Sequence, residues 1–177
     1  MSHEIRTPMN GILGMAEQLS FTPLDLEQRQ MVAIINQGAE GLLQLIGNVL
    51  DYAKLDAGKM QLAPTSFLLR ELADNVLTMI SSEVERKGLQ IYLRVDDEVG
   101  ARFNGDVLRL KQVLFNLVSN AVKFTERGFI ELSISQEWQS AGEQRLLFEV
   151  QDTGIGMSAE VQARIFNAFE QADGATT

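Results

Sequence analysis

Residues Leu110–Thr125 read LKQVLFNLVSNAVKFT, and this stretch decides the fold expected for the second part of the chain. Asn116 and Asn120 are four residues apart and Lys123 follows three residues later, so the three side chains project in the same direction. Two neutral oxygen ligands beside one cation suit a hydrated magnesium ion and the phosphates that it carries. The alternative is an ordinary solvated helix face. The apolar residues recur at helical spacing and are expected to face a core: Val113, Leu114, Leu117, Val118 and Ala121.

The rest of residues 59–177 alternates between helical and strand periodicity. Asp106 is the predicted N-cap of the asparagine-bearing helix, which is expected to end near Gly128. Ser158 is the predicted N-cap of a short helix that is expected to run through Phe169. Alternating apolar residues predict three strands, at Ile91–Val95, Ile130–Ile134 and Leu146–Val150. A further helix ending near Gly88 is predicted from Leu69, Leu72, Ala73, Val76, Ile80 and Val84. We therefore expect an α+β sandwich, with an antiparallel-leaning sheet and helices on one face.

Residues 1–58 are predicted to form a helical hairpin. The first helix runs to about Leu19, Thr22 caps the second with Pro23 at its first position, and the second helix stops at Gly58. The second helix carries a heptad stripe: Met31, Ile35, Gly38, Leu42, Leu45, Val49 and Tyr52. One hairpin cannot cover such a stripe, so it packs either on the chain's own second domain or on a second hairpin. We expect a homodimer through a four-helix bundle.

Bulk composition excludes several classes of protein. The chain has 177 residues, of which 45% are hydrophobic, and a net charge of −9 that argues against nucleic-acid binding. It has no cysteine, so no disulfide or thiolate metal site is possible. No apolar run approaches the ~20 residues of a membrane helix, and the N-terminus lacks the apolar segment of a signal peptide. We expect no membrane contact by this segment and a cytoplasmic location, either free or as the cytoplasmic portion of an inner-membrane sensor.

A second candidate site follows a predicted strand and reads DTGIGM, from Asp152 to Met157. Its glycines, Gly154 and Gly156, let backbone amides approach a ligand closely. An acidic residue before them is unsuited to phosphate, but it can accept a hydrogen bond from an amine such as the exocyclic amine of adenine. The alternative is a plain glycine turn.

A third candidate site is the N-terminal stretch HEIRTP, which contains His3, the only histidine of the chain. A neutral imidazole can act as a nucleophile. Glu4 could accept the Nδ1 proton and raise the electron density at Nε2, while Thr7, one helical turn later, could position a water molecule. The alternative is an idle histidine near a terminus.

Four motifs in this order resemble the signature boxes of sensor histidine kinases, most closely those of the hybrid type. Residues 2–13, SHEIRTPMNGIL, are similar to the H box, and residues 110–128, LKQVLFNLVSNAVKFTERG, are similar to the N box. DTGIGM resembles the first glycine box, and IFNAFEQAD, residues 165–173, resembles the F box. The resemblance covers essentially the whole chain.

The resemblance implies a two-component kinase that transfers a phosphoryl group from ATP to an imidazole nitrogen and then to a receiver-domain aspartate. His3 would be the phosphoacceptor, Glu4 would aid transfer, and Thr7 would support phosphatase action on a response-regulator receiver domain. A hinge around residues 58–64 would bring the nucleotide to His3.

The resemblance also implies the nucleotide site. Asn120 would ligate Mg²⁺ with support from Asn116, and Lys123 would contact phosphate. Asp152 would read the adenine of ATP. These are the residues that the pattern of spacing and chemistry above singles out.

The catalytic part is expected to have the Bergerat ATP-binding fold. Gly154 and Gly156 would shape its pocket, and Phe166 and Phe169 would either anchor the base of an ATP lid or pack in the core. The chain is expected to end before the second glycine box, which leaves the catalytic domain truncated.

Two functional hypotheses follow. In the first, residues 1–58 are a dimerisation and phosphotransfer hairpin, and residues 59–177 are the catalytic domain of a protein-histidine kinase. In the alternative, this truncated form is a non-catalytic dimerisation and signalling scaffold. A freestanding gyrase-type ATPase is disfavoured by the heptad hairpin.

Overall fold

The computed structural model describes residues 2–140 and 142–165, without the side chains of residues 2–4, 40, 44 and 48. The chain divides into two compact units, with the boundary in the sequence between Gln61 and Leu62. The first unit is helical, and the second combines helices with strands.

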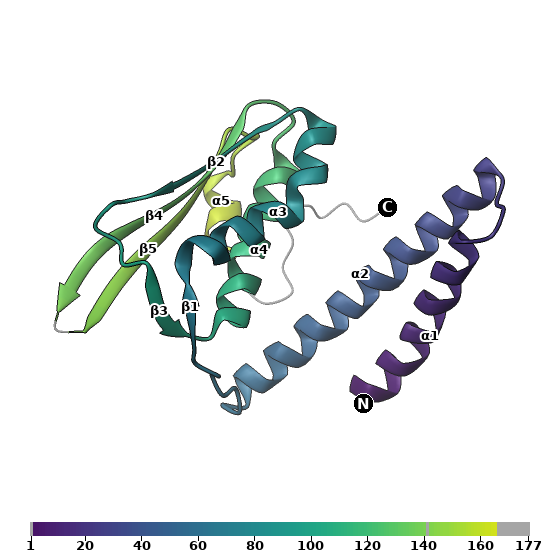
Figure 1. Ribbon diagram of the computed structural model, residues 1–177, viewed down its shortest axis with the longest axis horizontal. Helices are drawn as coiled ribbons and strands as arrows, with labels where there is room; N and C mark the ends of the chain where they lie inside the picture. Colours follow the sequence, from purple (N-terminus) through teal and green to yellow (C-terminus); the bar gives the residue numbers. More distant parts are fainter. Residues whose placement is uncertain (1, 141, 166–177) are drawn as a thin grey trace. The chain divides into compact units, whose positions relative to one another are not determined.

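The first unit is a hairpin of two helices, α1 (Ser2–Ser20) and α2 (Leu26–Asp56), which lie side by side (Figure 1). α1 continues through Pro8, although proline removes one amide donor from a helix interior. The buried hydrophobic side chains described in this unit are small: Ala16, Val32 and Ala39. The helical hairpin predicted from the sequence is confirmed, and its own seam buries little apolar surface.

The connection between these helices differs from the predicted one. Asp25 caps α2, because its Oδ1 accepts a hydrogen bond from Gln28 N (2.8 Å) while Gln28 Oε1 accepts one from Asp25 N (3.1 Å). The predicted cap at Thr22 is wrong, and the Thr22 hydroxyl donates to Leu19 O at 2.7 Å. A reciprocal capping box satisfies two orphan amides at once, which favours the later start. α2 ends before Gly58, as predicted, and Gly58 has φ of +63°.

The heptad stripe of α2 is exposed. Leu45, near the middle of the stripe, has 63% of its surface exposed. The other exposed large apolar members are Met31, Ile35, Leu42, Val49 and Tyr52. A two-helix hairpin has a single seam, so a second apolar stripe needs a further partner.

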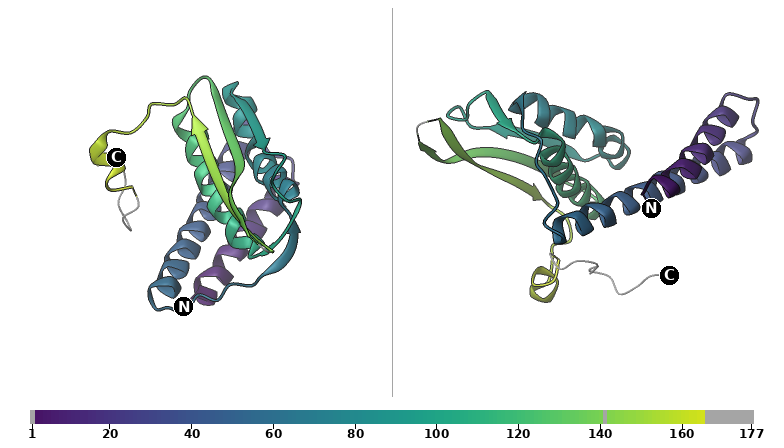
Figure 2. Two further views of the ribbon diagram at one scale, coloured as in Figure 1. Left: turned by 90° about the vertical axis from the view of Figure 1, so that its left-hand side faces the viewer. Right: turned by 90° about the horizontal axis from the view of Figure 1, so that it is seen from below.

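The second unit is a sheet of three strands with two helices on one face (Figure 2). The helices are α3 (Leu69–Lys87) and α4 (Val107–Phe124), and the strands are β2 (Gln90–Val95), β4 (Phe129–Ser140) and β5 (Glu143–Asp152). The predicted sandwich with helices on one face is confirmed.

The strand order is β2-β4-β5, and the sheet is mixed rather than mainly antiparallel. β2 runs parallel to β4, and β4 runs antiparallel to β5. The chain between β2 and β4 includes α4, and a crossover of this kind returns the next strand in the same direction. Periodicity within each strand carries no information about this choice.

A second sheet joins β1 (Thr65–Leu68) to β3 (Arg102–Gly105) in antiparallel register and was not predicted. Phe67 is paired with Phe103, and their ring centroids are 6.4 Å apart. Strands of four residues are too short to show a clear alternation, and they depend on a partner far away in the sequence.

The core lies between the helices and the sheet. All six apolar positions predicted for α3 are buried, as are these residues of α4 and β4: Leu114, Val118, Ala121, Val122, Ile130, Leu132 and Ile134. Val113 and Leu117 were expected in the core, but they are 54% and 41% exposed. α4 covers the sheet with a narrower stripe than the sequence pattern suggests, because these two residues lie toward the asparagine side of the helix.

Two helix ends also differ from prediction. α4 ends at Phe124 instead of near Gly128, because Thr125 has extended backbone angles. The short helix α5 (Ala159–Gln162) begins at the predicted cap, where Ser158 Oγ accepts from Val161 N at 3.3 Å. Residues 163–165 form a turn, so α5 does not continue as predicted, and residues 166–169 lie outside the described part of the chain.

Candidate functional site

The candidate site is built on α4, whose start is held by Asp106. The Asp106 carboxylate accepts hydrogen bonds from Arg109 N (3.1 Å) and from Ala63 N (3.0 Å), so it caps the helix and ties it to the segment before β1. The amide of Ala63 and then the amide of Arg109 hold the pKa of Asp106 below its ordinary value of 3.8, because both favour the ionised form. The predicted cap is confirmed.

The three candidate site residues of α4 are exposed in a single row. Asn116, Asn120 and Lys123 occupy the solvent side of α4 at helical spacing. The Lys123 ammonium lies 5.0 Å from the centroid of the Phe124 ring, which is within the range of a cation–π contact. This row offers two amide oxygens and a cation to a ligand in solvent.

The predicted loop Asp152–Met157 begins at the end of β5 and lies against the end of α4. Ile155 N donates to Phe124 O at 3.3 Å. Asp152 is exposed, and its Oδ1 accepts from Gly154 N at 2.8 Å. The loop therefore brings the acidic side chain to the same helix end that carries Lys123.

Glycine is required at two positions of this loop. A Cβ atom on Gly154 would overlap the carbonyl of Phe124 and Oδ1 of Asp152, so any side chain would push the loop off the helix. Gly156 has φ of +67°, a left-handed conformation that other residues adopt at a cost. These two glycines let backbone amides reach the site closely.

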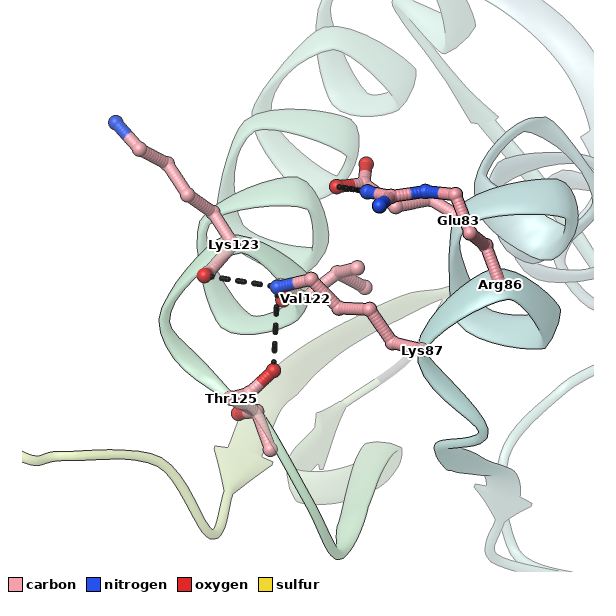
Figure 3. A network of polar contacts seen from close by, with 6 residues as sticks. All are labelled: Glu83, Arg86, Lys87, Val122, Lys123 and Thr125. Atoms are coloured by element: carbon pink, nitrogen blue, oxygen red, sulfur yellow. Dashed lines mark hydrogen bonds and ion pairs between the residues drawn. The ribbon is translucent and has the colours of Figure 1, made fainter.

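Two further residues hold this region together and were not singled out in the sequence. Thr153 Oγ1 accepts from Phe129 N (3.0 Å), which locks the loop onto the start of β4. Lys87, at the end of α3, donates to three backbone carbonyls at the end of α4 (Figure 3). The position of Thr153 between Asp152 and Gly154 could have suggested a structural role, whereas no local signal marks Lys87.

The donor set fits a nucleotide with a hydrated magnesium ion. Neutral amide oxygens bind Mg²⁺ well when most of its charge is met by phosphates. In the described part of the chain, no group of three or more His, Cys, Asp or Glu residues could hold a metal ion unaided. The face of α4 that carries Asn116, Asn120 and Lys123 is chemically suited to the phosphate end of such a ligand. Asp152, at the start of the glycine loop, is suited to its base end.

The N-terminal candidates belong to the hairpin. The backbone of His3 and Glu4 is helical in α1, but their side chains lie outside the described residues. Thr7 lies one turn further along α1 and is exposed. Phe166 and Phe169 also lie outside the described residues, so both roles considered for them stay predictions.

Comparison with known proteins bears on each unit. Residues 1–58 match the His Kinase A (phospho-acceptor) domain, and residues 105–177 match the histidine kinase-, DNA gyrase B- and HSP90-like ATPase family. The chain belongs to the sensor histidine kinases. The predicted resemblance is thereby confirmed.

Individual relatives of this kinase core agree with that assignment. The chain is 43% identical over 174 residues to the sensory/regulatory protein RpfC of Xanthomonas campestris pv. campestris, covering 98% of this chain and 24% of that protein. The crystal structure of full-length ShkA in complex with AMPPNP has a TM-score of 0.77 and 40% identity, over 98% of this chain and 36% of ShkA. Histidine kinase ThkA, solved with the response regulator protein TrrA, has a TM-score of 0.62 and 25% identity, over 96% of this chain and 48% of ThkA.

The chain thus spans about a quarter of the length of RpfC. Among its described helices, none is both long enough and apolar enough to cross a membrane.

Proposed function

We propose that this chain is the core of an ATP-dependent protein-histidine kinase that phosphorylates His3 and passes the phosphoryl group to the aspartate of a receiver domain. The observation that carries the proposal is the contact between Ile155 N and Phe124 O. It joins an adenine-reading carboxylate, Asp152, to the helix whose exposed row suits phosphates and magnesium. The likeness to ShkA, which was solved with AMPPNP, supports a nucleotide as the ligand.

In this proposal each polar residue has one task. The Asp152 carboxylate accepts a hydrogen bond from the exocyclic amine of adenine. Asn116 and Asn120 would hold the hydrated Mg²⁺, and Lys123 contacts phosphate. When bound there, Mg²⁺ would supply positive charge to offset that of the phosphates. The protein contributes mainly position and charge, since phosphoryl transfer needs little covalent help from side chains.

The acceptor half of the reaction is assigned to α1. His3 Nε2 attacks the γ-phosphorus of ATP. The bond between this phosphorus and the oxygen that bridges the β- and γ-phosphates breaks, and ADP leaves. Glu4 accepts the Nδ1 proton, which raises the electron density at Nε2. Thr7 positions water when a phosphorylated receiver is hydrolysed.

The exposed heptad stripe of α2 supports a homodimer, in which two hairpins form a four-helix bundle. The structural likeness to ThkA, solved with its response regulator, supports a receiver domain as the next acceptor. We place this core in the cytoplasm. The exposed stripe also fits a non-catalytic dimerisation scaffold, which is the alternative to a kinase.

The first test separates these two functions by chemistry. His3→Gln in this chain is expected to abolish acid-labile, base-stable phosphate after incubation with ATP, because His3 is its only histidine. Binding of ADP with Mg²⁺, measured by calorimetry, should be unchanged. Label retained at the same stoichiometry would refute the acceptor, and an unlabelled wild type would favour the scaffold.

A second test addresses the nucleotide site. Asp152→Asn should abolish calorimetric binding of ADP with Mg²⁺, because the amide cannot replace the carboxylate as an acceptor for the adenine amine with equal strength. Glu149→Gln is the matched control, since Glu149 is an exposed carboxylate on the same strand, β5. Equal loss in both variants would contradict a specific role for Asp152.

A further inference from the structure

The side chain of Lys87 connects α3 to the end of α4. Its Nζ lies 2.6 Å from Val122 O, 3.0 Å from Lys123 O and 3.2 Å from Thr125 O. Figure 3 shows the ammonium of Lys87 pointing into the end of α4, while the side chain of Lys123 points away from it. One ammonium therefore meets three carbonyls around a single helix end.

This contact satisfies both partners. A lysine ammonium has three donors, and the three carbonyls use all of them. The last carbonyls of a helix have no partner inside the helix, and they lie at the negative end of the helix dipole. Lys87 supplies the missing donors and a positive charge from a helix that is more than thirty residues away in the sequence.

The capped segment is also the surface on which the glycine loop rests. Phe124, whose carbonyl accepts from Ile155 N, lies between the capped residues Lys123 and Thr125. Thr125 itself is 0% exposed, so the chain is buried where it leaves the helix. Phe124 O lies so close to Gly154 that it occupies the place where a Cβ atom would stand, so a shift of the helix end would change this contact with the glycine loop.

We propose that Lys87 is a positioning residue of the nucleotide site. It fixes the last turn of α4, and so sets the distance between Lys123 on the helix and Asp152 at the base of the glycine loop. Lys87 has its donors directed at carbonyls, so it does not touch the nucleotide. The inference rests on the proposed function, because it assigns this region to a nucleotide.

The neighbouring cation Arg86 provides a matched control. Arg86 directly precedes Lys87 in the last turn of α3, but its guanidinium pairs with Glu83 of the same helix at 3.4 Å (Figure 3). Lys87→Met and Arg86→Met remove the same charge from adjacent positions. Only Lys87→Met removes donors from the end of α4.

Lys87→Met is expected to raise the KM for ATP and to lower kcat/KM for phosphorylation of His3 about tenfold, which corresponds to about 1.4 kcal/mol. The amide resonances of Gly154 and Ile155 should shift in spectra of the nucleotide-free protein, although Lys87 touches neither residue. Arg86→Met should leave both readouts unchanged. A purely structural role would lower stability without changing kcat/KM of the folded protein.

Chemical rescue gives a second, independent measurement. The chain has no cysteine, so Lys87→Cys creates a single thiol. Alkylation with bromoethylamine restores an ammonium at nearly the reach of lysine, whereas iodoacetamide leaves a neutral amide with two donors. Both derivatives are made from the same Lys87→Cys protein, and the neutral amide can still donate hydrogen bonds to two of the carbonyls at the end of α4. The comparison therefore remains valid if Lys87→Met does not fold.

The aminoethyl derivative should recover the wild-type KM and the wild-type resonance of Ile155, and the neutral derivative should recover neither. Equal kcat/KM and equal spectra in the two derivatives would overturn the role of Lys87. A wild-type protein that neither binds ADP nor becomes phosphorylated would instead refute the proposed function, so the two failures are distinguishable.

Discussion

The hairpin leaves Leu42 and Leu45 of α2 exposed, whereas the α/β unit buries Leu114 and Val118 of α4. Both helices carry regular apolar stripes in the sequence, yet only α4 finds a covering surface within its own unit. The sheet β2-β4-β5 supplies that surface for α4, while α1 covers only part of α2.

The difference shows that an apolar stripe in the sequence indicates which residues need to be buried. It does not indicate which surface covers them. The α/β unit has a continuous core of its own. The hairpin has a seam with small buried residues and a second stripe left over, so its stability should depend on protein concentration. Four substitutions test this contrast, two in each unit.

The largest effect is expected for Leu45→Asp in the hairpin. Each protomer of a bundle would lose a buried leucine worth about 1.5–3 kcal/mol and gain a charge, so the dissociation constant of the dimer should rise at least about 100-fold. Light scattering should then report monomers. Leu26→Asp is the control, because Leu26 is an equally apolar, exposed residue of α2 outside the stripe. A dimer that survives Leu45→Asp would mean that the stripe packs elsewhere.

The next largest effect is expected for Leu114→Ala in the α/β unit. Leu114 is almost fully buried, so the cavity should lower the free energy of unfolding by about 2–5 kcal/mol without changing the dimer. Urea unfolding followed by fluorescence reports this unit alone, because the single tryptophan, Trp138, lies on β4. Leu108→Ala, at an exposed position of α4, should change stability by less than about 0.5 kcal/mol. Equal effects in the two variants would contradict the observed core.

A smaller effect is expected at the start of α2. Asp25→Ala removes the carboxylate that accepts from Gln28 N, while the backbone amide of residue 25 can still donate to Gln28 Oε1, and the loss should destabilise the hairpin by about 1 kcal/mol. Thermal unfolding followed by circular dichroism should show it, while the fluorescence of Trp138 should not change. Asp25→Asn keeps a side-chain acceptor and should be nearly neutral. An asparagine variant as unstable as the alanine variant would argue against capping.

The smallest effect is expected at the start of α4, and it depends on pH. The folded protein lowers the pKa of Asp106, so ionised Asp106 contributes stability above the ordinary pKa of 3.8, and this contribution is lost as the pH falls through the lower, folded-state pKa. Asp106→Asn does not titrate, and its single amide oxygen can replace the acceptor of only one of the two hydrogen bonds, the one from Arg109 N or the one from Ala63 N. The difference in unfolding free energy between the two proteins should be constant near neutral pH and should shrink below about pH 3.8. A difference that stays constant down to strong acid would show that the charge is irrelevant.

Local patterns were sufficient for most of the fold. The six apolar positions of α3 are buried as predicted, and the caps at Asp106 and Ser158 lie where expected. Helix caps, glycine ends and apolar periodicity act over a few residues, so they can be read without knowledge of the rest of the chain. The cap of α2 was misplaced because two competing caps lie close together, and the reciprocal one at Asp25 satisfies more amides.

Long-range choices could not be read in this way. The parallel pairing of β2 with β4, the small sheet of β1 with β3, and the exposure of Val113 and Leu117 all depend on which surfaces meet in three dimensions. A strand of four residues has no distinct periodicity, and the direction of a neighbouring strand depends on the path of the connection.

The candidate site shows the same division. Residue chemistry and spacing are enough to propose Asn116, Asn120, Lys123 and Asp152 as site residues, because a helix places residues four apart on one face and a glycine turn admits a ligand. The meeting of α4 with the glycine loop through Phe124 and Ile155, and the cap supplied by Lys87, were decided only by tertiary structure. Chemical identity is local, but the distance between two groups far apart in the sequence depends on the packing of the whole core.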